Sequence, residues 1–148
     1  MSANLKDWLK FGWLKEHKTS GQEIADLFAV GDRDLGACKT PGLHNDWRFN
    51  IAYNAALQLA SAALAAAGYQ AERSNHHYRV IESLGLTLGV DAATIRMFDT
   101  FRKKRNISDY ERTGGVSDLE ADEMRQLAER LRVEVEVWIH KNHPQKKL

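Results

Sequence analysis

Cysteine and proline are scarce in this sequence of 148 residues, which contains one cysteine and two prolines. Because Cys38 has no second cysteine to pair with, an intramolecular disulfide is excluded, and a reducing compartment is favoured. An excess of one charge is also lacking, since the formal net charge at pH 7 is +1. A protein that is basic over its whole surface is therefore excluded, whereas a local basic patch is not.

A long, uninterrupted apolar segment is missing as well. The longest apolar stretch, 55–68, contains Gln58 and Ser61 and is too short to cross a bilayer. Charged residues occur early, at Lys6 and Asp7, where a signal peptide would have its apolar region. We therefore expect a cytoplasmic protein that is not inserted in a membrane.

Several motifs of known chemistry are absent too. The sequence has no glycine-rich phosphate loop after a strand and no serine or cysteine nucleophile motif. A metal site would have to use scattered residues whose spacing does not resemble that of zinc ligands: Cys38, His44, His76 and His77. We therefore expect neither a metal nor a cofactor.

Helical periodicity is abundant, and we predict one all-α domain over residues 1–148. Apolar residues recur at spacings of three and four in 5–13, 24–28, 46–68, 76–84, 91–102 and 117–138. Ser20 with Glu23 and Ser117 with Glu120 have the form of capping boxes, which start helices. The glycine-containing stretch 31–42 and the segment 113–115 are predicted to be loops. The tail after Pro144 is predicted to fray.

The segment 46–68 predicts a central helix. Nearly all of it is apolar, much of it is alanine, and its polar residues form one narrow stripe: Asp46, Asn50, Asn54, Gln58 and Ser61. A helix that is apolar over most of its surface packs on several sides. We therefore predict an up-and-down antiparallel bundle of four or five main helices, with short extra helices at the N-terminus.

Two details of this bundle are also predicted from the pattern. Val133-Glu-Val-Glu-Val137 alternates as a strand would, but we keep it helical because the heptad-like pattern of the last helix runs through it. Trp8 and Trp138 lie at helical spacing with other apolar residues and are assigned to the core.

A cationic segment, Arg102-Lys-Lys-Arg105, is predicted at the end of a helix. It has two interpretations: favourable charge placement at a helix C-terminus, or a phosphate-binding patch in which arginine provides a planar fork. If the helix continues, Arg105 and Asp109 form an i,i+4 pair, which adds an ordinary ion pair as a further alternative.

Three segments, taken together with the helix order, are informative: Asn50-Ile-Ala-Tyr-Asn-Ala55, Gly68-Tyr69 followed by His76-His-Tyr-Arg-Val-Ile-Glu-Ser-Leu84, and Arg102-Lys-Lys-Arg-Asn-Ile-Ser-Asp-Tyr110. Over residues 45–140 this arrangement resembles the HEPN superfamily of small nucleotide-linked helical domains. The resemblance implies a helical bundle that forms a homodimer, with a polar motif near the interface. Many members are metal-independent ribonucleases or toxins in which an arginine is followed, after four to six residues, by a histidine.

This sequence departs from the family motif at one position. Where the histidine is expected after Arg102, the chain has Asp109, and an aspartate beside arginines stays ionised and does not supply a proton. We therefore expect RNA or nucleotide binding without cleavage. The residues expected to bind are Arg102, Arg105, Asn106, Asp109, Tyr110, Tyr53 and Asn54.

Two other functions stay open. One is a ribonuclease toxin in which His76 or His77 replaces the missing histidine, and the other is a structural or adaptor dimer. As further partners, the resemblance implies a nucleotidyltransferase or an antitoxin.

Overall fold

The protein is all-α, as predicted, with one very small sheet. The computed structural model describes residues 3–110 and 115–146, and side chains within 3–105 and 115–145. Its elements in chain order are α1 (Leu5–Lys10), β1 (Leu14–Glu16), α2 (Gly21–Ala37), α3 (Asn45–Ala66), β2 (Tyr69–Ala71), α4 (His76–Ser83), α5 (Ala92–Tyr110), α6 (Asp118–Asn142) and the 3-10 turn η1 (Pro144–Lys146).

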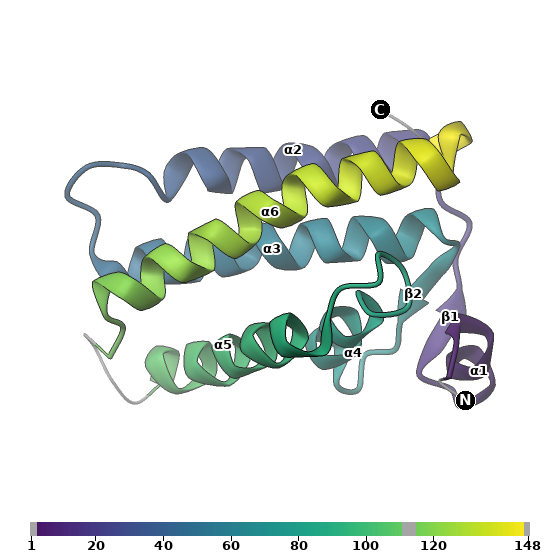
Figure 1. Ribbon diagram of the computed structural model, residues 1–148, viewed down its shortest axis with the longest axis horizontal. Coiled ribbons are helices and arrows are strands. Elements are labelled where there is room, and N and C mark those ends of the chain that lie inside the picture. The colour runs from purple at the N-terminus through teal and green to yellow at the C-terminus, as the bar shows by residue number, and fades with distance from the viewer. Residues whose placement is uncertain (1–2, 111–114, 147–148) are drawn as a thin grey trace.

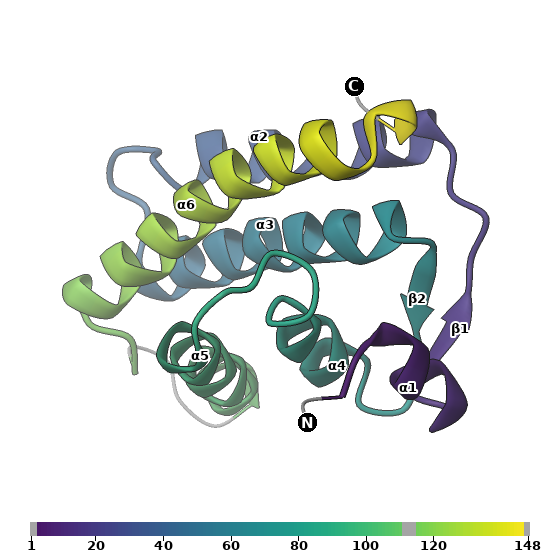
Figure 2. The ribbon, with the colours of Figure 1, turned by 45° about the vertical axis from the view of Figure 1, so that its right-hand side comes forward.

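The helices lie in two groups around α3 (Figures 1 and 2). α2 and α6 cover one side of α3, and α4 and α5 lie on the opposite side. The four long helices α2, α3, α5 and α6 alternate in direction along the chain, as predicted for an up-and-down bundle. As a result α3 and α6, which are not consecutive, run in the same direction. The short elements α1, β1 and β2 gather at one end of α3. No helix in the described part of the chain is long and apolar enough to span a membrane.

Helix α3 is the central helix that its composition predicts. Thirteen of its residues are buried, among them Phe49, Tyr53 and Leu59. Eight of the buried residues are alanines, whose short side chains let α2 and α6 pack closely against the backbone of α3. The helix begins after His44, whose ring nitrogen accepts the backbone N–H of Asp46 at 3.2 Å.

The predicted loop 31–42 is wrong over its first half, because α2 continues through it to Ala37. Gly31 is buried, and a Cβ at this position would lie 3.2 Å from the Leu59 side chain, so glycine here allows close helix packing. Leu35 is buried as well. Tertiary packing against α3 thus outweighs the low helix propensity of glycine.

The first helix is shorter than predicted. It ends at Lys10, and Gly12 adopts a left-handed conformation with φ +80°, which redirects the chain. Residues 14–16 then pair antiparallel with Tyr69–Ala71, with Leu14 opposite Ala71. These two strands were not predicted, because three residues are too few to show an alternating pattern.

The remaining helix predictions are confirmed where the structure describes them. Residues 133–137 are helical within α6, and the capping box of Ser117 and Glu120 is formed. Ser20 caps α2, but Glu23 turns its carboxylate toward His17 instead of back to Ser20. Trp8 is buried and Trp138 partly so. Most of the predicted break at 113–115, and residues 147–148 of the tail, lie outside the described residues.

Candidate functional site

An open groove of about 340 Å³ lies where the start of α4 meets α5. Its lining residues are Arg73, Asn75, His76, His77, Tyr78 and Arg102. Two arginines and two histidines therefore face one space, and none of the lining residues is acidic. This combination favours an anionic ligand.

Arg102 is held in place on one side only. Its Nε donates to Asp99 Oδ1 at 2.7 Å, and its guanidinium carbon lies 5.5 Å from the centre of the Tyr78 ring. The side chain of Arg102 is 22% exposed, so these two contacts fix its orientation at the edge of the groove. Within the described residues its terminal nitrogens have no hydrogen-bond partner, which leaves the planar fork for a ligand.

Arg105 lies deeper than Arg102. Its guanidinium carbon is 5.1 Å from the centre of the Tyr53 ring, and its Nε is buried without a hydrogen-bond partner among the described residues. A buried donor of this kind is costly unless an acceptor is supplied.

His77 links the groove to the core of the bundle. Its Nδ1 lies 3.3 Å from the hydroxyl of Tyr53, a side chain that is only 1% exposed. Burial raises the pKa of Tyr53 to about 12, so the phenol keeps its proton at neutral pH. Burial also lowers the pKa of His77, and electrostatic interactions with Arg105, His76 and Arg102 lower it further. The imidazole of His77 is therefore held neutral beside the arginines.

This lowered pKa predicts a pH dependence of stability. The unfolded chain takes up a proton at His77 near its ordinary pKa of about 6.5, whereas the folded chain resists it. The free energy of unfolding contributed by His77 should therefore be present above about pH 6.5 and decline as the pH falls below it. We expect the free energy of unfolding, measured by urea denaturation, to fall between about pH 8 and about pH 5.5. The fall should be smaller for His77→Gln than for the wild type.

A matched control for this prediction is His140→Gln, which removes an exposed imidazole from α6. This variant should keep the wild-type difference in stability between the two pH values. An equal pH dependence in His77→Gln and the wild type would contradict the assignment to His77.

The structure does not bring all predicted site residues together. Asn54 lies on the α2 side of α3, where its Nδ2 donates to Asp34 Oδ2 at 2.7 Å. Tyr53 does lie beside Arg105, but its ring is buried and offers no open face for stacking on a base. The side chains of Asn106, Asp109 and Tyr110 lie outside the described residues.

The two lysines of the cationic segment do not line the groove and form ion pairs. Lys104 Nζ lies 2.9 Å from Glu120 Oε2 on α6, and Lys103 Nζ lies 3.5 Å from Asp99 Oδ2. Of this segment, Arg105 and Arg102 are the residues whose charges lower the pKa of His77. The interpretation as charge placement at a helix C-terminus is wrong, because α5 continues to Tyr110 and the segment lies within the helix. The interpretation as a phosphate-binding patch stays a prediction.

Two features of the groove were not predicted from the sequence. Arg73 is separated from the cationic segment by almost thirty residues of sequence, and only the packing of α4 against α5 brings Arg73 and Arg102 to one groove. Asn75, before α4, adopts a left-handed conformation with φ 56° and makes no side-chain cap hydrogen bond. An N-terminus without a side-chain cap presents backbone N–H groups and the positive end of the helix dipole, which favour anions.

Comparison of the chain with protein-family models, with curated proteins and with solved structures found no match. We therefore infer function from the groove and the cluster beneath it. Among the side chains that the structure describes, within 3–105 and 115–145, no three of histidine, cysteine, aspartate or glutamate gather closely enough to hold a metal ion.

Proposed function

We propose that this chain is a HEPN-like helical domain that binds RNA or a nucleotide in the groove between α4 and α5, without cleaving it. The observation that carries the proposal is the convergence of Arg73, Arg102 and the histidine pair 76–77 on one space without a lining carboxylate. The bundle and the position of the cationic segment are in line with the family resemblance.

A phosphate group fits this arrangement chemically. The terminal nitrogens of Arg102 form a bidentate donor that matches two phosphate oxygens. The N-terminus of α4, the other helix at the groove, adds backbone N–H donors and the positive partial charge of its helix dipole. Because the histidines of the groove do not need to be charged for these contacts, binding should persist at neutral pH.

As the resemblance implies, we include a homodimer in the proposal, with the motif near the interface. A nucleotidyltransferase or an antitoxin is the kind of further partner that such a domain would have. Sedimentation velocity of the purified chain tests for the homodimer. Co-expression with the neighbouring reading frame tests for the further partner.

Cleavage of RNA is a second candidate function, favoured by one observation. His77 is held neutral, lies within 3.3 Å of the Tyr53 hydroxyl and is close to two arginines. A neutral imidazole is a competent general base, and arginines stabilise the charge that develops on a phosphate during transfer. In this arrangement His77 replaces the histidine that Asp109 displaces from the family motif.

Binding is tested with a fluorescein-labelled single-stranded RNA and fluorescence anisotropy at low salt. Arg102→Gln and Arg73→Gln should each weaken binding about tenfold, because each removes a charge-assisted contact. Each should also make the slope of log affinity against log salt shallower by about 0.7, the value for one contact to a single strand. The control Arg96→Gln removes an exposed charge from the same helix α5 and should change neither quantity appreciably.

The outcomes separate the candidate functions. Equal affinities for Arg102→Gln, Arg96→Gln and the wild type would overturn the groove as the binding site. No measurable affinity in any variant, with reduced stability in Arg102→Gln, would instead indicate the structural or adaptor role. When the protein–RNA mixtures of the anisotropy measurement are incubated with a chelator and analysed on denaturing gels, the RNA should remain intact. Cleavage that is lost in His77→Gln would establish the ribonuclease.

A further inference from the structure

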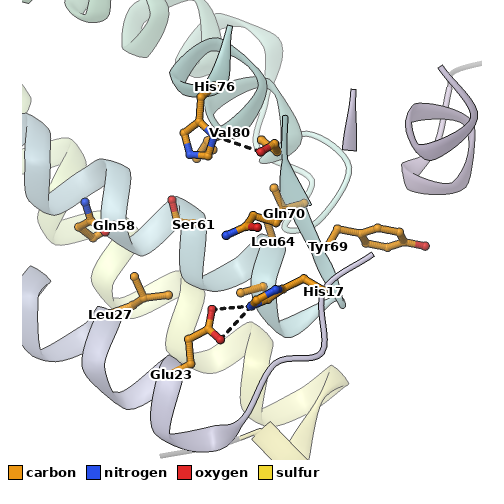
Figure 3. Close-up of a pocket in the computed structure, with 12 residues that line it drawn as sticks. His17, Glu23, Leu27, Gln58, Ser61, Leu64, Tyr69, Gln70, His76 and Val80 are labelled. Carbon is orange, nitrogen blue, oxygen red and sulfur yellow. Dashed lines mark hydrogen bonds and ion pairs between the residues drawn. The ribbon is translucent and has the colours of Figure 1, made fainter. Parts of the chain in front are cut away.

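A second cavity, of about 200 Å³, lies between α2, α3, β2 and α4 (Figure 3). His76 lines both this cavity and the proposed phosphate groove. The polar side chains around the cavity come from four elements and from the segment before α2: Glu23, Gln58, Ser61, Gln70, His76 and His17. Nothing in the proposed RNA or nucleotide binding uses this cavity.

The polar lining is rich in hydrogen-bond acceptors. His76 Nδ1 lies 3.1 Å from the backbone carbonyl of Ala71, and because a carbonyl only accepts, Nδ1 carries the proton. In the neutral ring Nε2 is then an acceptor. Gln58 uses its Nε2 toward Asn54 Oδ1, at 3.4 Å, which leaves its carbonyl oxygen as a second acceptor.

Glu23 adds a carboxylate to these acceptors. Both of its oxygens lie 2.9 Å from His17 Nε2, and the two side chains are 36% and 28% exposed, so the carboxylate is partly desolvated. Among the described residues that line the cavity there is no lysine or arginine to neutralise it. The electrostatic preference of this cavity is therefore opposite to that of the groove that His76 also lines.

The rest of the lining is apolar. Leu27 from α2, Leu64 from α3 and Val80 from α4 form walls against which a compact hydrocarbon body can pack. The volume is below the range of about 300–1,000 Å³ typical of sites for drug-sized ligands, so only a small molecule fits. A planar group has an advantage here, since a carboxylate accepts two parallel N–H bonds from a planar fork.

We propose that this cavity binds a small nitrogen cation of the amidine or guanidine class, carried on a compact apolar body. The two parallel N–H groups of the fork bond to the Glu23 carboxylate in place of His17, and the remaining donors face Gln58 and His76. The apolar body packs on Leu27, Leu64 and Val80.

Benzamidine is the probe for this site, and benzoate is its control of nearly the same shape and opposite charge. Titration calorimetry of the full chain with benzamidine should show binding at least about tenfold tighter than with benzoate, because a charged hydrogen bond contributes that much. Glu23→Gln keeps the size of the side chain, removes its charge and should weaken benzamidine binding by about the same factor. The control Glu16→Gln, at an exposed position of β1 that does not line this cavity, should leave it unchanged.

An independent readout is the nitrogen–proton NMR spectrum, which resolves the side-chain amides of glutamines. On titration with benzamidine, the Gln58 and Gln70 side-chain signals of the wild type should shift, and benzoate should leave them in place. Equal affinity for benzamidine and benzoate, or benzamidine shifts confined to residues outside the cavity, would overturn the proposal. Because RNA binding is measured at the groove by other variants, failure of either site leaves the test of the other intact.

Discussion

Replacing Leu131 by alanine should lower the free energy of unfolding by about 2–5 kcal/mol, the range for truncating a fully buried leucine. Leu131 lies on α6 and has no exposed surface, and α6 is one of the two helices that cover the central helix α3. Truncation removes buried methyl groups and leaves a cavity, because the surrounding helices relax only in part. Equilibrium denaturation in urea measures the change as a lower midpoint with an unchanged slope.

Val133→Ala is the matched control for Leu131→Ala. Val133 lies two residues further along α6 and is 62% exposed, so its truncation should change the free energy of unfolding by no more than about 0.5 kcal/mol. Similar losses at both positions would mean that the face of α6 toward α3 is assigned incorrectly.

Asn54→Ala should be the next most destabilising change, at about 1.5–3 kcal/mol, the range for a hydrogen bond to a charged group. Asp34 is 8% exposed, and its carboxylate accepts from Asn54 Nδ2 at 2.7 Å and from Arg33 Nε at 3.0 Å. Removing Asn54 leaves one oxygen of a buried carboxylate without its donor. Thermal or urea denaturation measures this loss.

The affinity for RNA distinguishes a structural role of Asn54 from the binding role that the family resemblance predicts. Anisotropy with the labelled RNA should give the wild-type affinity for Asn54→Ala, because the side chain faces α2 and not the groove. Gln22→Ala is the control: it removes a similar bond, to Asp26 at 2.8 Å, from an exposed position, so it should be nearly neutral. A loss of affinity in Asn54→Ala without a loss of stability would restore Asn54 to the binding site.

The groove and the cavity together give His76 an unusual place. It lines both the cationic groove and the acceptor-rich cavity, so the two proposed ligands of opposite charge would both lie beside this residue. The ring is oriented by its hydrogen bond to the carbonyl of Ala71. His77, next to it in sequence, instead contacts Tyr53, and Arg105 and Arg102 lower its pKa.

Most of the helices were evident in the sequence because helix formation depends on residues three and four apart. The apolar, alanine-rich segment 46–68 predicted α3, and the Ser117 and Glu120 pair predicted the start of α6. The heptad-like pattern correctly favoured helix over strand at 133–137. The cationic segment was also evident, but its predicted position at the end of a helix is wrong, because α5 continues to Tyr110. The participation of Asn106, Asp109 and Tyr110 in binding stays a prediction.

The contacts of the candidate site were decided only by the tertiary structure. Nothing local indicates that Arg73 and Arg102 line the same groove, that His77 meets Tyr53, or that Glu23 turns to His17 instead of closing its capping box. The same holds for α2, which continues through Gly31 because that glycine packs on Leu59. The physical reason is the same in each case: a helix is specified within a few residues of chain, whereas the face it turns to its neighbours is settled by packing between distant segments.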